Sequence, residues 1–303
     1  MRFFADQLTL GLTLGAIYAL IALGYTLVYG IIELINFAHG DIYTVGGLIG
    51  LSLIGLLGLE HASAAFLIGG LVVVFVAAMG LNGLLGMLIE RVAYRRLRNA
   101  PRLAPLITAV GVSFILEGAI FLIKGPNHIS YPNLLPSGTL NLGGYSLASQ
   151  NLIIIVLALA LMVGLHQFIQ RTRMGRAMRA TAQDRDAARL MGININRTIA
   201  LTFFLGSALA AAAGIVNGFY FQDIIFNQGF QAGLFAFTAA VFGGIGNVVG
   251  AAIGGFAIGV IVAMVAGYMQ GGQQWSDVFV FSILILVLVF RPTGILGMQV
   301  PEK

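Results

Sequence analysis

Long apolar runs separated by short polar connections dominate the chain. A spanning helix needs about 20 mostly apolar residues. The runs that approach this length cover residues 8–32, 42–59, 64–89, 103–123, 152–169, 198–221, 230–249, 251–269 and 278–290. The second run is short and the seventh is interrupted by glycines, so either could be a broken or re-entrant segment. The pattern predicts an all-α polytopic membrane protein with about eight or nine transmembrane helices.

The composition excludes several classes of protein. Apolar residues make up 59% of the chain and charged residues 9%, whereas soluble domains have about 45–50% and about 25%. So little charge cannot cover a water-facing surface, which excludes an ordinary soluble enzyme, a disordered chain and a nucleic-acid-binding domain. The 41 glycines indicate close helix packing in lipid. Because cysteine is absent, a disulfide framework and a thiolate metal site are also excluded.

The basic residues predict the orientation of the chain. The segments 90–102 and 171–197 hold 12 of the 16 lysines and arginines, and by the positive-inside rule both are cytoplasmic loops. The connection 124–151 contains three prolines and reads as an external loop. Three spans before the first basic loop place the N-terminus outside, and Arg291 and Lys303 favour a cytoplasmic C-terminus. The whole chain, 1–303, reads as a single transmembrane domain whose positive charge reports orientation, with no nucleic-acid partner.

Polar side chains inside the apolar runs are candidates for a translocation path. Asn36, His39 and Asp41 join the first two runs, and Glu117 lies within 103–123. Ionisable groups at membrane depth usually face a cavity or a partner. The alternatives are structural: Asp41 as a helix N-cap in an interfacial turn, and Glu117 hydrogen-bonded to another helix or subunit. A proton relay through His39 lacks a matching series of acidic residues.

Glycine-interrupted segments occur in each half of the chain, at 36–50 and 237–255. Such pairs can mark an internal repeat with a path at the membrane midplane. Asn82, Asn217 and Asn247 are simply read as interhelical hydrogen-bonding residues, although Asn247 also lies in the second segment. The candidate path residues are Asn36, His39, Glu117, Thr238 and Asn247.

The basic loop 171–197 predicts a short amphipathic helix. Its middle consists of good helix formers, and Ala180, Ala187, Leu190 and Met191 fall on one stripe at helical spacing. Gly192 is a suitable C-terminal stop. The helix could lie on anionic lipid, or it could enter a groove on a cytoplasmic partner.

The same loop carries a resemblance to a known family. The segment DAARLMG, residues 186–192, resembles the EAA motif of ABC importer permeases (Glu-Ala-Ala, three residues, Gly), with aspartate in place of glutamate. In that family the loop forms the coupling helix that docks on the ATPase subunit. The resemblance therefore implies ATPase coupling by Asp186, Ala187, Ala188, Leu190, Met191 and Gly192.

Further segments make the resemblance specific. GAIYALIALGY at 15–25, INFAHG at 35–40, AFTAAVFGGIG at 236–246 and PTGILG at 292–297 resemble the LivH-type permeases of branched-chain amino acid ABC importers. The resemblance implies a fold like that of type II ABC importers in the bacterial plasma (inner) membrane. It implies a second, LivM-like permease, LivG-like and LivF-like ATPase subunits, an external solute-binding protein and surrounding lipid. The chain has no GxxxxGK[ST] phosphate loop, so ATP and Mg would be bound by the partner subunits.

Three alternatives to branched-chain amino acid import bear on the function. A urea or short-amide permease of the same family fits a path with little fixed charge. An ion-coupled secondary transporter would need a carboxylate cluster at the midplane, where only Glu117 is central. An intramembrane enzyme is disfavoured, because HExxH and GxSxG are absent and the four histidines lack the spacing of metal ligands. The chain is thus read as a transport subunit, not an enzyme.

Overall fold

The computed structural model describes residues 2–34, 36–98, 100–101, 103–136, 138–142 and 145–297. Helices form nearly all of it, as the long apolar runs predict. The long helices are α1 (Arg2–Ile32), α2 (His39–Leu56), α3 (Ala64–Ile89), α4 (Leu103–Lys124), α5 (Ser149–Arg171), α8 (Ile195–Phe221), α9 (Gln228–Gly243), α10 (Val248–Tyr268) and α11 (Gly272–Phe290). The short ones are η1 (Leu59–His61), η2 (Glu90–Tyr94), η3 (Arg95–Leu97), α6 (Arg173–Gln183) and α7 (Arg185–Leu190).

Seven helical segments of the described chain are long and apolar enough to cross a membrane. They are α1, α3 with its continuation through η2 and η3, α4, α5, α8, α10 and α11. The two runs that seemed doubtful as full crossings form the shorter helices α2, with 18 residues, and α9, with 16. The predicted all-α polytopic architecture is therefore confirmed, and the chain is a multi-pass membrane protein. The described residues contain seven candidate spans, where the sequence predicted about eight or nine.

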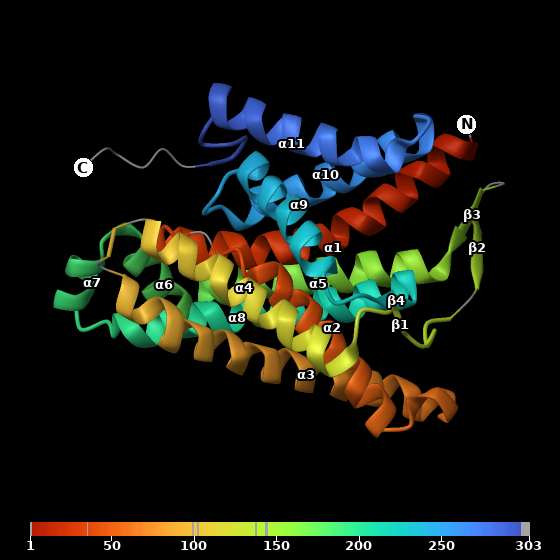
Figure 1. Cartoon of the computed structure of the whole chain (residues 1–303), viewed down its shortest axis with the longest axis horizontal. Coiled ribbons are helices and arrows are strands. Elements are labelled where there is room, and N and C mark those ends of the chain that lie inside the picture. The colour runs from red at the N-terminus through yellow and green to blue at the C-terminus, as the bar shows by residue number, and fades with distance from the viewer. Residues whose placement is uncertain are drawn as a thin grey trace.

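The molecule has two chemically distinct ends (Figure 1). The basic end carries η2, η3, α6 and α7, and the hairpin end carries the start of α1 and strands β2 (Thr139–Leu142) and β3 (Tyr145–Ala148). The two basic loops meet directly, since Arg98 Nη1 donates to Asn196 Oδ1 at 2.6 Å. Arg102 and Lys303 lie outside the described residues. The side of the membrane that each end faces stays a prediction.

Two small antiparallel sheets mark the loops of the hairpin end. β2 pairs with β3, with Thr139 opposite Ala148. β1 (Ile129–Ser130) pairs with β4 (Asp223–Ile224), which fastens the predicted external loop to the end of α8. Both pairings satisfy backbone groups in the connections, and the β1–β4 pair packs into the bundle, where Ile224 is fully buried.

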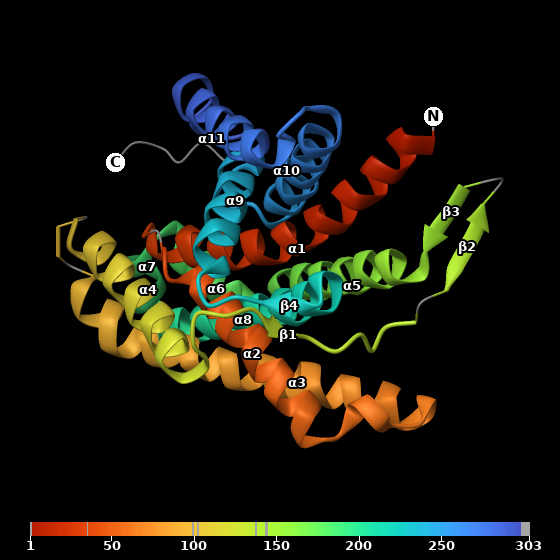
Figure 2. The ribbon, with the colours of Figure 1, turned by 45° about the vertical axis from the view of Figure 1, so that its right-hand side comes forward.

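Helices α1 and α8 form the centre of the bundle, and α10 packs against the other side of α1. A Cβ added to Gly15 of α1 would lie 2.7 Å from the Phe256 Cα of α10, and one added to Gly11 would lie 2.7 Å from Val260 Cα. The GxxxG spacing therefore places two backbones in contact, as small residues do in membranes. Figure 2 shows α9 beside α10, and both lie between α1 and α11.

The basic loop contains two helices where the sequence predicted one. Helix α6 ends at Gln183 and α7 begins at Arg185, because Asp184 has extended backbone, with φ −155° and ψ 113°. Its Oδ1 accepts hydrogen bonds from the N–H groups of Asp186 at 2.9 Å and Ala187 at 3.0 Å. An aspartate that caps a new helix also ends the previous one. The single predicted stripe is therefore wrong, since Ala180 lies on α6 and Leu190 on α7.

Candidate translocation path and docking helix

The path candidates in the first half lie where α2 begins inside the protein. His39 and Asp41 are buried, with Gly40 between them. A Cβ added to Gly40 would overlap the Gly229 carbonyl and would lie 3.0 Å from Gly233 Cα. The starts of α2 and α9 therefore cross in backbone contact, which only glycine at these positions allows. Helices α2 and α9 both start inside the bundle, and such helix starts often line the translocation path of a transporter.

Asn36 and His39 are held by neighbouring aromatic rings. The Tyr94 hydroxyl donates to Asn36 Oδ1 at 2.7 Å, so the loop before α2 is tied to η2. The His39 ring meets the Tyr25 ring edge-on, with centroids 4.8 Å apart. A Cβ on Gly24 would overlap the imidazole of His39, so that glycine makes room for the ring. These contacts give both residues a packing role, and their path role stays a prediction.

Asp41 does not cap its helix, contrary to the structural alternative considered from the sequence. The N-cap of α2 is Ala38, and no side chain caps the helix. Instead, the fully buried Asp41 carboxylate accepts a hydrogen bond from the Ser113 hydroxyl of α4. Glu117 follows Ser113 by one turn and lies within electrostatic reach of Asp41. The polar contact between α2 and α4 was missed because its partners are 72 residues apart.

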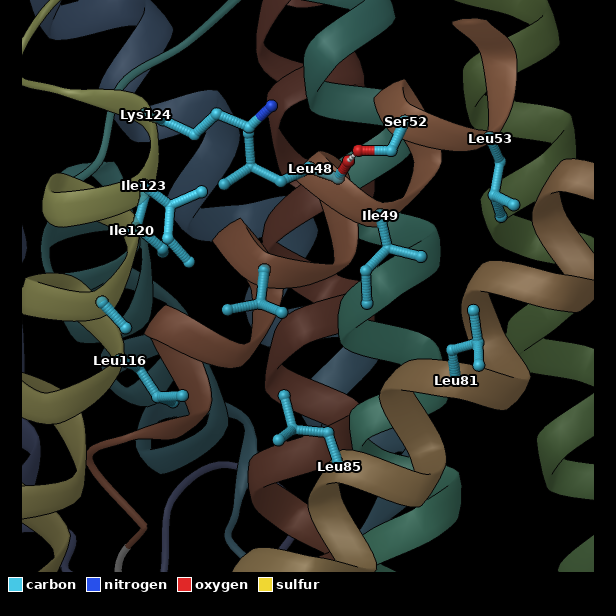
Figure 3. A pocket seen from close by; sticks show the side chains of 12 residues that line it. Leu48, Ile49, Ser52, Leu53, Leu81, Leu85, Leu116, Ile120, Ile123 and Lys124 are labelled. Atoms are coloured by element: carbon cyan, nitrogen blue, oxygen red, sulfur yellow. Dashed lines mark hydrogen bonds between the residues drawn. The ribbon is translucent and has the colours of Figure 1, made fainter. Parts of the chain in front are cut away.

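An apolar crevice follows the same two helices toward the hairpin end (Figure 3). It has a volume of about 530 Å³ and lies between α2, α3 and α4. Leu48 and Ile49 of α2 line it together with Leu116 of α4. Its polar lining residues are Ser52, whose hydroxyl donates to the Leu48 carbonyl at 2.8 Å, and Lys124. Walls of this kind suit an acyl chain better than a zwitterionic solute.

The path candidates in the second half have local hydrogen-bond partners. The Thr238 hydroxyl donates to the Leu234 carbonyl within α9 at 2.9 Å. Asn247 is the N-cap of α10: its Oδ1 accepts from Val249 N at 3.0 Å, and its Nδ2 donates to the Leu296 carbonyl at 2.8 Å. Structural roles account for these contacts. A path role for Thr238 or Asn247 stays a prediction.

Asn82 confirms the expectation of an interhelical hydrogen-bonding residue. Its Nδ2 donates to the Ile42 carbonyl at 3.0 Å and to the Ser207 carbonyl at 2.8 Å. The side-chain amide of Asn82 on α3 thus joins α2 to α8. The two carbonyls that accept from it belong to helices, so these hydrogen bonds are additional to the backbone bonds of the helices. The buried asparagine fixes the position of α2.

A charge cluster at the basic end holds the first basic loop in place. Glu90 is fully buried and pairs with Arg95 at 2.8 Å and with Arg98. Burial lowers the pKa of the Arg98 guanidinium, and the adjacent Glu90 carboxylate opposes that shift. Arg185 of α7 donates to the Ile31 carbonyl of α1 at 2.9 Å. Several arginines that indicated orientation therefore also join α1, α3, α7 and α8.

Helix α7 exposes an apolar tip at the far edge of the basic end (Figure 1). Leu190 is 89% exposed and Met191 is 83% exposed, whereas Ala188 is buried. Gly192 stops the helix with φ +81°, in the left-handed region that favours glycine. Of the remaining coupling candidates, Asp186 and Ala187 are exposed. The implied coupling residues thus lie together on α7 and the turn that follows it, and all of them except Ala188 are exposed.

Comparisons with known proteins identify what the chain is similar to. Residues 7–288 match the family model described as the permease component of branched-chain amino acid transport systems. The high-affinity branched-chain amino acid transport permease protein BraD of Pseudomonas aeruginosa is 45% identical, over 99% of this chain and 98% of that protein. LivH of Escherichia coli K12 is 42% identical over the same shares. Among solved structures, PsaBC from Streptococcus pneumoniae in complex with Fab matches with a TM-score of 0.48 at 16% identity, over 97% of this chain and 93% of that one.

Proposed function

This chain belongs to the family of branched-chain amino acid transport permease components, and from that membership we propose that it forms half of an import path for leucine, isoleucine and valine. Membership makes it a transport protein rather than an enzyme. The near full-length identity to BraD and LivH supports this choice of substrate, because those proteins carry that function in their names.

The proposed assembly contains a second permease, two ATPase subunits and an external binding protein. Family membership places the chain in an ABC system of several components. In our proposal the hairpin end receives solute from the binding protein, and the basic end contacts the ATPases in the cytoplasm. The N-terminus then lies outside and the C-terminus inside. The concentration of arginines at one end supports this orientation.

The observation that carries the proposal is the exposed pair Leu190 and Met191 on α7. Large apolar side chains at the tip of a water-facing loop usually mark an interface. Burial of one such side chain in a groove contributes about 1.5–3 kcal/mol. A groove on a protein suits this short helix better than a lipid surface does, because the groove can match the shape of the small apolar patch.

A charge placed at this tip tests the docking role. In Leu190→Asp the coupling turn loses an apolar contact and would have to bury a carboxylate. We expect the ATPase subunits to be lost from the purified complex and ATP-driven leucine uptake to fall by more than about tenfold, since each 1.4 kcal/mol is a factor of ten. Insertion of the variant into the membrane should be unchanged.

The matched control is Gln270→Asp, which introduces the same charge at an exposed position near the hairpin end. It should retain both the ATPase subunits and uptake. If the Leu190→Asp complex keeps its ATPases and transports leucine normally, α7 is not the docking helix.

Transport by the reconstituted complex separates the candidate substrates and energy sources. We expect labelled leucine to enter proteoliposomes only when the binding protein and ATP are present. Preferential uptake of urea would support the short-amide alternative. Uptake that persists without ATP would support an ion-coupled transporter, for which the Asp41, Ser113 and Glu117 group is the relevant observation.

A further inference from the structure

The hairpin end contains a cavity of about 750 Å³ whose described lining includes none of the five path candidates. We call it the outer cavity. Helices α1, α8, α9, α10 and α11 surround it, together with Tyr43 of α2 and His128 before β1. Its size falls within the usual range for sites that bind small molecules, about 300–1,000 Å³. Its position matches where an imported solute would first enter the permease.

One side of the outer cavity is apolar. Leu14 and Ile17 of α1 face it, as does Val262 of α10. Phe235 of α9 closes this side by edge-on contacts with the rings of Tyr18, at 5.6 Å between centroids, and Phe281, at 6.2 Å. Aliphatic and aromatic walls of this kind favour a branched aliphatic side chain.

The other side of the cavity is acidic and aromatic. Asp277 of α11 accepts a hydrogen bond from Gln231 Nε2 at 3.0 Å, which orients the carboxylate. Tyr18 lines the cavity within electrostatic reach of Asp277. Asp223 also lines it, and its Oδ2 contacts the Nδ1 atom of His128, so this carboxylate already has a partner within the protein. A carboxylate and an aromatic ring that line the same cavity are groups that can recognise an ammonium ion.

Amide groups line the cavity as well and could bind an anion. The Nε2 atom of Gln228 is buried without a hydrogen-bond partner among the described residues. Its Oε1 accepts from Ile225 N at 3.3 Å, which fixes the side chain at the start of α9. Asn217 of α8, only 7% exposed, lines the same cavity. A buried, unpaired donor is unfavourable unless a ligand satisfies it.

We propose that the outer cavity is an entry site for free α-amino acids with aliphatic side chains. Asp277 and Tyr18 hold the ammonium group, Gln228 and Asn217 donate to the carboxylate, and the wall of Leu14, Ile17 and Val262 receives the side chain. Both charges of the zwitterion are thereby compensated away from water. The inference rests on the proposed function, since it names where the imported substrate first binds.

Two variants of the complete transporter test the site. Asp277→Asn removes the charge that attracts the ammonium group. Gln228→Glu retains the oxygen that accepts from Ile225 N but places a negative charge beside the ligand carboxylate. In proteoliposomes with the binding protein and ATP, we expect each variant to raise the KM for leucine by about tenfold, a change of about 1.4 kcal/mol, while the purified complex keeps all its subunits.

The control is Asp6→Asn, which neutralises an exposed carboxylate at the same end but outside the described lining. It should leave the KM unchanged. A leucine analogue without the ammonium group, 4-methylpentanoate, should inhibit the uptake of labelled leucine much less than unlabelled leucine does in the unmodified protein. In Asp277→Asn the difference between the two inhibitors should be smaller.

The possible outcomes separate the two proposals. If the unmodified complex imports leucine and neither cavity variant changes the KM, the entry site is wrong and the proposed function stands. If the unmodified complex does not import leucine, the proposed function itself fails. If Asp277→Asn instead abolishes docking of the binding protein, the cavity is part of a protein interface and the entry-site proposal is overturned.

Discussion

Helices α1 and α8 differ sharply from α4 and α11, although all four are apolar and long enough to cross a membrane. In the most apolar stretch of each helix, 83% of α1 and 78% of α8 are buried, against 17% of α4 and 11% of α11. Small residues explain the difference: α1 contains Gly11 and Gly15, and α8 contains a buried run from Ala210 to Ala213. An apolar sequence is enough to place a helix in the membrane. A position at the centre of the bundle also requires small residues where the helix faces its neighbours.

Glycine alone does not produce this packing. Gly111 and Gly118 of α4 have no atom within 4 Å of an added Cβ. Large apolar side chains such as Phe114 and Ile115 are exposed on the same helix. We therefore expect α4 and α11 to face lipid or the second permease that we propose, where substitution is better tolerated than in the centre.

The largest loss of stability should come from a side chain that blocks the close contact between α1 and α10. In Gly259→Leu the new side chain would overlap backbone atoms of Gly15 and would start 2.6 Å from the Gly11 carbonyl. Backbone cannot move aside as a flexible side chain can, so we expect a loss of about 3 kcal/mol or more, or no folded protein. Thermal unfolding in detergent, followed by size-exclusion chromatography, measures it.

The control on the peripheral helix is Gly111→Leu. It should change the stability by less than about 0.5 kcal/mol, because the position is open. Equal unfolding temperatures for the two leucine variants would contradict the division into central and peripheral helices.

A smaller effect should follow from removing the amide that joins α2 and α8. Asn82→Ala leaves the Ile42 and Ser207 carbonyls without their additional donor. We expect a loss of about 1–3 kcal/mol. Asn227→Ala is the control, because Asn227 is exposed and its side chain makes no capping bond. If both alanine variants unfold at the same temperature, the Asn82 bonds do not stabilise the bundle.

The smallest effect should occur outside the bundle, at the cap of α7. Asp184→Ala removes the acceptor for the Asp186 and Ala187 amides, and loss of such a cap costs about 1 kcal/mol. Hydrogen exchange of these two amides should become faster while the unfolding temperature changes little. Asp186→Ala, at a side chain that is 91% exposed, should leave the exchange unchanged. Faster exchange in both variants would show that the Asp184 cap is not the cause.

The sequence predicted the regions that depend on local patterns and missed those that depend on distant partners. The nine apolar runs became helices, and the two runs interrupted or shortened in sequence became α2 and α9, which are not among the seven candidate spans of the described chain. The predicted coupling turn lies at the exposed tip of the basic end. The prediction of a single helix in 171–197 was wrong. It relied on helix propensity and apolar spacing and did not consider Asp184 as the N-cap of a second helix.

The candidate site was predicted in part. Asn36, His39 and Asp41 do lie where α2 begins inside the bundle, yet their partners Tyr94, Tyr25 and Ser113 come from other elements. The outer cavity had no sequence signal, since its lining residues are scattered over six helices and a loop.

By itself, the sequence determined that the chain spans a membrane, which loops share an end, and to which family it belongs. Membrane partition follows from runs of about 20 apolar residues, and the predicted orientation follows from nearby charges; both are local properties. Only the tertiary structure decided which helices are central, which carboxylate meets which hydroxyl, and where a cavity remains. Those features arise from contacts between residues far apart in the chain, for which no local periodicity exists.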